Sequence, residues 1–521
     1  MKTVDIPSSA DRARWLREAA ELAPAPQTRV VPFARAVNFI ADTSAFQGWR
    51  AEPLGPPSSV FDRELREGDY SDFDLGAHGV GAPVFSLESV TPGLDAPVCL
   101  RVLLGELPFE IAAPREPFHS NMLARTWLQE ETLYLDTLPA AVVLPRRYAF
   151  RYVRIIVAGL SPRHRLRLTG LSARLTAATF DAAPPPPANL TPFQARIDTV
   201  AVQTLRNCLH SVFEDGPKRD RRLWLGDLRL QALANSVTFR RFDLVKRCLL
   251  LFAGLARPDG LVEACVFENP QPQASGNLMV DYALLFAPTL LDYAEASMDW
   301  DTAHDLWPLA RHQVATITAD FDANGKLPPG EPFGWAFIDW QPALHREGAL
   351  LGLAIYALRQ SAKLANGVGD ENGMNQLNAR AEALTRIARE QWRAADGSFI
   401  SGPDAQRSLA TTAWMILAGV VTDVEARAVL HQALNDPAHL RPAGPYLWHH
   451  VIHACHLVGD HATGQRLLEE YWGKMLDLGA DTFWEVFDPD NHFASPYENA
   501  QLNSYCHAWS CTPAWFLRTL N

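Results

Sequence analysis

Residues 214–227, EDGPKRDRRLWLGD, place four carboxylates and four basic side chains around a Gly-Pro turn. Such a stretch could be a solvated loop, an anion-binding patch or the acid–base apparatus of an enzyme. The formal net charge of the chain is −12, which disfavours a nucleic acid as its main partner. Because carboxylates alternate with the basic residues, a free-standing phosphate site is not favoured. Acid–base chemistry is the preferred interpretation.

Tryptophans beside carboxylates indicate a carbohydrate pocket. The chain has 15 tryptophans. An aromatic face binds the C–H side of a sugar ring, and a neighbouring carboxylate binds its hydroxyls. Any single pair is more often core packing, but three of them in the helical half favour a sugar pocket. The pairs are Trp224 with Asp227, Trp335 and Trp340 with Asp339, and Trp484 with Glu485.

The first stretch resembles the signature of the α-L-rhamnosidases of glycoside hydrolase family 78. In that family, Asp-Cys-Pro-x-Arg-x-Glu is followed after a short spacer by Gly-Trp-x-Gly-Asp. Here Asp215-Gly216-Pro217-Lys218-Arg219-Asp220 precedes Trp224-Leu225-Gly226-Asp227, so Gly216 replaces the Cys and one residue is missing. Counting from Asp215 puts Arg221 at the position of the catalytic Glu, whereas a deletion after Arg219 puts Asp220 there. The resemblance then implies that Asp220 is the general acid.

Further segments resemble the same family in the same order. The segment 479–488, GADTFWEVFD, is similar to the one that carries the general base, which implies this role for Glu485. The segment 502–517 resembles one with a substrate-binding His, and FIDW (337–340) resembles an element of the sugar pocket. In the N-terminal part, 127–139 and 144–155 resemble the family's β domain. The substrate-binding residues implied are Asp215, Arg219, Trp224, Asp227, Asp339, Trp340 and His507.

The chemistry fits an inverting glycosidase, which needs a protonated carboxyl and a carboxylate about 6.5–9.5 Å apart. Asp220 and Glu485 lie near opposite ends of the helical half of the sequence, so closure of a ring would bring them together. The neighbouring arginines would favour an ionised Asp220, contrary to the needs of an acid. We therefore expect Arg219 to pair with Asp215 or with substrate, and Arg221 and Arg222 to point outward.

The pattern of the chain changes at 182–194, AAPPPPANLTPFQ, where four prolines form a stiff linker. Before it, short segments alternate between apolar and polar residues, as in antiparallel sheets. These segments are 98–105, 132–138, 150–159 and 164–175. The prediction is a β-sandwich domain over 80–181, preceded by an accessory segment over 1–79 that begins with a helix at 9–22.

After the linker, about a dozen amphipathic helices are predicted, the first capped by Thr191 with Pro192 in its first turn. The clearest are 192–213, 241–256, 280–297, 346–365, 374–392 and 501–520. No fixed-length repeat is present, which disfavours a solenoid. Twelve helices fit an (α/α)6 barrel of six hairpins over 195–521. The predicted fold class is thus multidomain β + α, a β-sandwich followed by this barrel.

Two metal-like patterns are not favoured. The acidic residues of 320–331 have the spacing of a calcium loop, but Pro328 and Pro329 interrupt it. His449, His453 and His456 share one helical face, which a barrel-lining helix explains better than zinc. No metal and no cofactor are expected.

Seven scattered cysteines without a CxxC pair, a charged start and the lack of a long apolar run predict a cytoplasmic protein without a membrane span. The expected partners are small rhamnose-containing glycosides, with no nucleic acid and no membrane, and a homodimer is left open. The predicted function is an inverting α-L-rhamnosidase. The alternatives are another six-hairpin glycosidase or lyase, or a sugar-binding protein that has lost catalysis.

Overall fold

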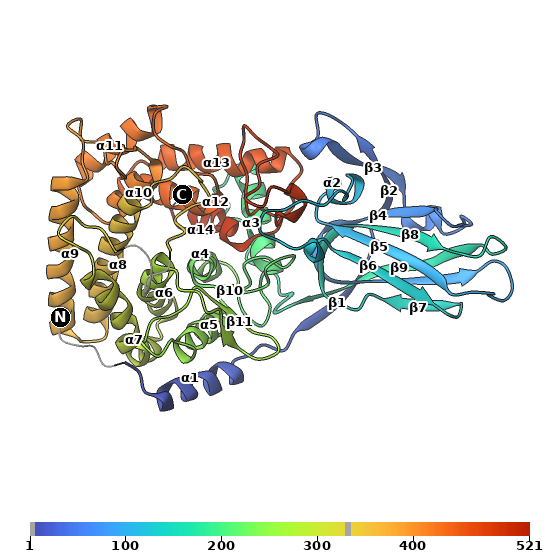
Figure 1. The fold of residues 1–521 in the computed structure, drawn as a ribbon, viewed down its shortest axis with the longest axis horizontal. Coiled ribbons are helices and arrows are strands. Elements are labelled where there is room, and N and C mark those ends of the chain that lie inside the picture. Colours follow the sequence, from blue (N-terminus) through green and yellow to red (C-terminus); the bar gives the residue numbers. More distant parts are fainter. Residues whose placement is uncertain (1–5, 329–334, 521) are drawn as a thin grey trace.

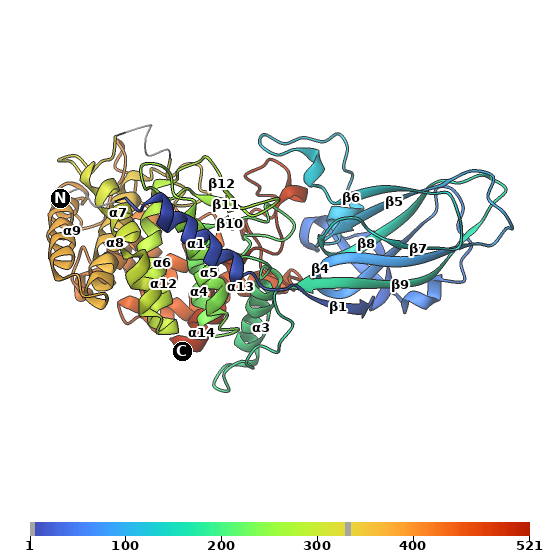
Figure 2. The same ribbon diagram turned by 90° about the horizontal axis from the view of Figure 1, so that it is seen from below.

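The computed structural model describes residues 6–328 and 335–520, which form a β domain beside a helical barrel (Figure 1). The same side-by-side arrangement is seen from below in Figure 2. Within the described residues, no helix has the length and apolar character needed to cross a bilayer.

The β domain is built on one antiparallel nine-stranded sheet that wraps around a hydrophobic core. β4 pairs with β8 along both parts, with a register shift between Asp74 and Gly79; its first part also pairs with β2, and its second part with β7 and β9. The four segments expected to be strands are confirmed as parts of β5, β6, β8 and β9. The strands are β1 (Gln27–Pro32), β2 (Arg35–Ala41), β3 (Trp49–Gly55), β4 (Tyr70–Ser89), β5 (Val98–Gly105), β6 (Glu130–Leu135), β7 (Ala140–Val143), β8 (Tyr148–Gly159) and β9 (Leu166–Ala177).

The segment 1–79 is divided between the two domains. The boundary expected at residue 80 falls inside β4, and β1, β2 and β3 already belong to the sheet, because their partners β9 and β4 come from the predicted sandwich. The helix expected at 9–22 is α1 (Ser9–Glu21), and it packs on α5 of the barrel. Trp15 of α1 is only 2% exposed and donates its Nε1 hydrogen bond to Asp305 at 2.7 Å. Helix α1 is therefore part of the barrel surface.

The helical domain contains twelve α-helices within the described residues, arranged as six hairpins. Thr191 caps the first as predicted: its hydroxyl accepts the Gln194 amide at 3.2 Å, and the Gln194 side chain accepts the Thr191 amide at 2.9 Å. The helices are α3 (Pro192–Asn207), α4 (Leu225–Ser236), α5 (Phe242–Gly254), α6 (Val280–Ser297), α7 (Trp300–Ala319), α8 (Glu347–Gly367), α9 (Glu371–Gln391), α10 (Leu409–Leu417), α11 (Asp423–Asn435), α12 (Pro445–Leu457), α13 (His461–Asp477) and α14 (Pro513–Thr519). Short elements complete the chain, namely α2 (Phe109–Ala112) in the β domain and a small sheet of β10 (Leu223–Trp224), β11 (Cys265–Phe267) and β12 (Gln273–Ala274).

An inner ring of helices surrounds the barrel axis. Helices α4, α6, α8, α10 and α12 contact one another in succession and are buried on nearly all sides, as inner helices must be. A 3-10 turn at Ala508–Cys511 contacts both α12 and α4, and so closes the ring. Helices such as α3, α9 and α13 bury one face only and form the outer layer. The predicted (α/α)6 barrel is confirmed.

The prediction of one helix over 501–520 is wrong for the first part of that range. Only α14 is α-helical, because the amides of 504–508 bond to distant groups instead of to their own turn. Ser504 donates to Glu485, Tyr505 to Glu106 and Ala508 to the carbonyl of Asp215. The helix predicted over 192–213 is also shorter than expected, because α3 ends at Asn207.

The docking of α1 gives a first prediction. Trp15→Ala should lower the free energy of unfolding by about 3–5 kcal/mol, because it empties a buried site and removes a hydrogen bond to Asp305. The measurement is urea denaturation. Arg17→Ala, on the exposed face of the same helix, is the control and should change it by no more than about 0.5 kcal/mol. Equal effects of the two variants would contradict the docking of α1.

Candidate active site

A pocket of about 240 Å³ opens at the end of the barrel where the predicted catalytic segments meet. It is lined mainly by the loop before α4, the segments around 335–340 and 485–509, and a loop of the β domain. The sequence-predicted residues that line it are Asp215, Arg219, Asp220, Trp224, Asp227, Trp340, Glu485 and His507. Residues distant in sequence are therefore brought into one cavity.

Asp215 organises a compact loop in the catalytic segment. Its carboxylate accepts the amide of Arg222 at 3.0 Å and that of Asp220 at 3.2 Å. A Cβ at position 216 would clash with the carbonyl oxygen of Arg219, so the close approach of the loop requires Gly216. Burial, and after it the charge of Asp220, raises the pKa of Asp215 to about 8.

Arg219 connects the two predicted catalytic carboxylates. Its buried guanidinium donates one Nη to Glu485, and its other Nη lies 3.4 Å from Asp220 Oδ1. The ring of Tyr497 lies 4.2 Å beneath the guanidinium carbon. The expectation that Arg219 pairs with Asp215 is wrong, because the Asp215 oxygens are occupied by backbone amides while Glu485 faces the arginine.

Glu485 is a buried carboxylate surrounded by donors. Besides Arg219, the Tyr497 hydroxyl donates to its Oε1 at 2.6 Å and the Ser504 amide donates to its Oε2 at 3.0 Å. These three donors fix the orientation of the buried Glu485 carboxylate.

Asp220 lies towards the opening of the pocket, with its side chain 16% exposed. Arg222 Nη1 is 3.4 Å from its Oδ2, and the Arg222 guanidinium stacks 4.3 Å above Phe267. Arg222 therefore does not point outward as expected, because an aromatic ring and a carboxylate hold it at the pocket. Arg221 turns away from Asp220 and donates to the carbonyl of Pro217 at 2.9 Å.

His507 lies between two buried carboxylic groups. Its Nδ1 is 3.7 Å from Asp227 Oδ1, and its Nε2 is 3.9 Å from Asp215 Oδ2. Burial lowers the pKa of His507, and burial together with the Asp215 charge raises the pKa of Asp227. Among the described residues, neither Asp227 Oδ1 nor His507 Nδ1 has a hydrogen-bond partner, so both can bind a ligand hydroxyl.

Two predicted pocket residues lie elsewhere. Trp484 is 0% exposed, and its ring is 4.4 Å from that of Phe46, so it belongs to the core. Asp339 is buried behind the pocket, where its Oδ2 accepts the amide of Ala443 at 2.7 Å. Burial raises the pKa of Asp339 to about 7. Asp339 therefore holds a loop and does not line the pocket.

Several residues of the site carry no recognisable motif. Tyr497 and Ser504 bind Glu485 as described. Tyr497 lies in a segment without a regular pattern, and Ser504 lies in the segment 502–517, in which the sequence indicates a role only for His507. Asp281, at the start of α6, accepts the amides of Phe337 and Ile338, each at 2.9 Å, and so anchors the loop with Trp340. The signal for Asp281 in the sequence is an acidic residue at the start of the apolar helix predicted over 280–297.

The β domain supports the catalytic segments through buried charges. Lys218 binds Glu110 of α2 and donates to the carbonyls of Gln501 and Asn503 at 2.8 and 2.7 Å. Glu106 accepts the amide of Tyr505 at 2.7 Å. The β domain thus helps to position the segment 501–505, which follows Glu485 in the chain.

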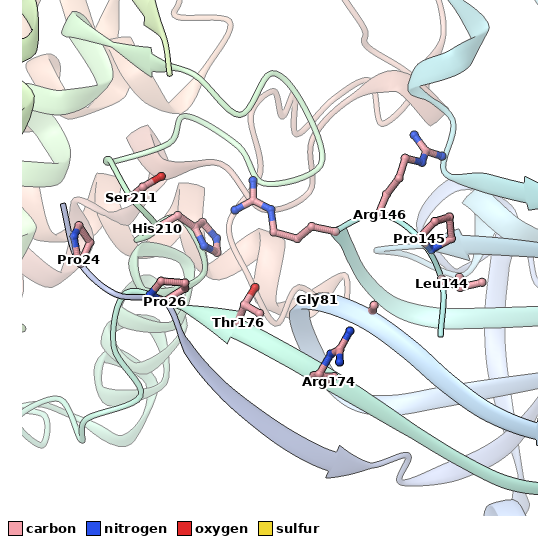
Figure 3. Close-up of a pocket in the computed structure, with 12 residues that line it drawn as sticks. Pro24, Pro26, Gly81, Leu144, Pro145, Arg146, Arg174, Thr176, His210 and Ser211 are labelled. Carbon is pink, nitrogen blue, oxygen red and sulfur yellow. The ribbon is translucent and has the colours of Figure 1, made fainter. Parts of the chain in front are cut away.

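A larger cavity, of about 430 Å³, lies at the junction of the two domains (Figure 3). Arg146 and Arg174 reach it from the β domain, and His210 and Ser211 from the segment after α3. Arg147 also lines it and pairs with Glu214 at 2.7 Å. Neither catalytic carboxylate lines this cavity, so the smaller pocket is the candidate active site.

The metal-like patterns have other structural roles. Over 6–328 and 335–520, no group of three or more His, Cys, Asp or Glu side chains is arranged to hold a metal ion. Asp322 accepts the amides of Asn324 and Lys326 in a turn, and Pro329 and Glu331 lie outside the described residues. Burial lowers the pKa of His449 and of His453.

In comparisons with known proteins, both domains match domains of α-rhamnosidases. Residues 33–175 match the N-terminal domain of glycosyl hydrolase family 78 α-rhamnosidases, and residues 191–520 match the six-hairpin glycosidase domain of bacterial α-L-rhamnosidases. A rhamnosidase from Klebsiella oxytoca, solved with rhamnose bound, is 41% identical with a TM-score of 0.94, over 97% of this chain and 98% of that chain.

Two further structures share the fold at lower identity. A family 78 rhamnosidase from Bacillus sp. GL1 is 22% identical with a TM-score of 0.75, over 90% of this chain and 49% of that one. An α-L-rhamnosidase from Streptomyces avermitilis, complexed with L-rhamnose, is 18% identical with a TM-score of 0.64, over 88% of this chain and 43% of that one. A search of curated protein sequences found no match.

The anchoring of the 337–340 loop gives a second prediction. Asp281→Ala should lower the free energy of unfolding by about 2–4 kcal/mol, because two buried amides lose their charged acceptor. Asp320→Ala, which removes an exposed carboxylate after α7, should change stability little. Urea denaturation of both variants checks this, and an unchanged midpoint for Asp281→Ala would remove Asp281 from the anchoring role.

Proposed function

The chain belongs to glycoside hydrolase family 78, the α-L-rhamnosidases, and we propose that it hydrolyses terminal α-L-rhamnosyl groups of small glycosides with inversion. The observation that carries this proposal is the pair of carboxylates, Asp220 and Glu485, on the two Nη atoms of Arg219 in one pocket. An acid and a base in one cavity is the arrangement that glycoside hydrolysis requires. The proposal includes a cytoplasmic location, for which the sequence composition is the support.

Glu485 is the base that activates water. Its three donors, from Arg219, Tyr497 and Ser504, fix the direction of its carboxylate. The incoming water transfers a proton to Glu485 while its oxygen attacks the anomeric carbon of the sugar. Attack opposite to the leaving group inverts the configuration.

Asp220 is the acid that protonates the leaving oxygen. Its position near the opening suits this role, because the departing group must leave towards solvent. The contacts to Arg219 and Arg222 hold its carboxyl in place. After the reaction, Asp220 recovers a proton from water, and the proton on Glu485 returns to solvent.

The remaining pocket residues bind the sugar. Asp215, Asp227 and His507 offer polar atoms on the buried floor, and Trp224 and Trp340 provide aromatic walls. Asp227 Oδ1 and His507 Nδ1, which have no hydrogen-bond partner within the described part of the chain, are suited to two neighbouring hydroxyls.

A lyase is less well supported. A lyase would use Tyr or His as its base at a uronate. The Tyr497 hydroxyl donates a hydrogen bond to Glu485, and burial raises the pKa of Tyr497. Both oppose the loss of the phenolic proton that a Tyr base requires. The presence of a carboxyl at position 220 also disfavours an inactive sugar-binding protein.

A panel of nitrophenyl glycosides tests the proposed function. The α-L-rhamnoside should be hydrolysed, and Glu485→Gln should lower its turnover by a factor of about 10²–10⁴ because the base is lost. Binding of rhamnose without turnover by the unaltered protein would favour the sugar-binding alternative instead.

Replacement of Asp220 should affect substrates according to their leaving groups. An acidic nitrophenol departs without help, whereas a sugar alcohol needs a proton. Asp220→Asn should therefore lose roughly 10²-fold or more in kcat/KM on a rhamnosyl disaccharide but much less on nitrophenyl rhamnoside.

Asp215→Asn and Asp227→Asn are the controls, and each should show similar losses on the two substrates. If Asp227→Asn gives the leaving-group dependence and Asp220→Asn does not, the acid is not Asp220.

A further inference from the structure

The opening of the active-site pocket is apolar, and part of it comes from the β domain. Met122 and Leu123, in the loop between α2 and β6, line the pocket together with Trp335 and Trp340 of the barrel. Met122 is 63% exposed and Trp335 is 46% exposed. Large apolar side chains gathered and exposed around one opening indicate a binding surface.

The loop that carries Met122 is fixed to the barrel. Asn499 donates to the carbonyl of His119 at 3.0 Å, and the His119 ring is 2.8 Å from Glu498. Asn121, next to Met122, donates to the carbonyl of Pro496 at 3.3 Å. Segment 119–121 is therefore bound to segment 496–499, which also contains the Glu485 partner Tyr497.

Leu123 continues this contact into the pocket wall. It packs against the cluster of Tyr497, Leu128 and Leu502, to which Trp340 also contributes. Trp335 is held on the barrel side, where its carbonyl accepts the amide of Val280 at 3.3 Å. The backbone segments that carry these apolar side chains are thus held in place on both sides of the opening.

The depth of the pocket determines which part of a glycoside meets this surface. Asp215, Asp227 and His507 are buried at the floor, whereas Asp220 is partly exposed. A terminal sugar on the floor places its glycosidic oxygen at Asp220. The group attached to that oxygen must then extend past Met122 and Trp335 towards solvent.

We propose that Met122 and Leu123 of the β domain, with Trp335 of the barrel, bind an apolar alkyl or aryl aglycone linked directly to the sugar. This inference rests on the proposed function. Among the described residues that line the opening, only Asp220 and Arg222 are polar, and they contact each other at 3.4 Å, so an apolar group finds more partners there than a second sugar does. The flexible thioether of Met122 adapts to aglycones of different shape.

Methyl and hexyl α-L-rhamnosides test this assignment, because their leaving alcohols have similar basicity and differ in apolar length. Each methylene that becomes buried contributes up to about a fourfold gain in binding. The unaltered protein should therefore have a kcat/KM at least about tenfold higher for the hexyl than for the methyl compound. Met122→Ser should lower this hexyl-to-methyl ratio by roughly fivefold, and Met122→Leu should preserve it.

Tyr134→Ser is the matched control, since Tyr134 is exposed on β6 of the same domain and does not line the pocket. The proposal is overturned if the unaltered protein shows no preference for the hexyl compound, or if Met122→Ser behaves like Tyr134→Ser. It is also overturned if a rhamnosyl-glucose disaccharide is the better substrate and Met122→Ser slows it. Failure to hydrolyse any rhamnoside, nitrophenyl rhamnoside included, would instead contradict the proposed function.

Discussion

One buried guanidinium joins the two ends of the active site. Arg219 lies in the segment before the first inner helix, and its partner Glu485 lies after α13. A buried charge that loses its partner costs about 3–5 kcal/mol, so a barrel that closed without this pair would be destabilised by about that amount. The same guanidinium stacks on Tyr497 and contacts Asp220, and so orders the catalytic groups as well as the fold.

The loop around Asp215 gives a structural reason for Gly216. Its turn brings the Arg219 carbonyl onto position 216, where the Cβ of a Cys would clash. The Ser504 hydroxyl donates to this carbonyl at 2.9 Å, which connects the loop to the segment after Glu485. Carboxylates of the β domain bind the same region, and the β domain is therefore part of the active-site architecture.

The sequence predicted the fold class and eight of the residues that line the pocket, because both depend on local patterns. Alternating strands, capped amphipathic helices and the 215–227 motif can each be recognised without tertiary contacts. The contacts of Arg219 and the role of Tyr497 could not be predicted, since they depend on side chains far apart in the chain. Trp484 was misplaced because a Trp-Glu pair has the same sequence whether its ring faces a sugar or, as here, Phe46.

The stereochemistry of the first product tests the central claim most directly, namely that Glu485 activates water while Asp220 protonates the leaving group. Proton NMR of α-L-rhamnoside hydrolysis resolves the two anomers of the released sugar before they interconvert. This account predicts that β-L-rhamnose appears first and that the α anomer accumulates only later. Initial release of α-L-rhamnose would contradict it, because retention requires a carboxylate that attacks the sugar itself.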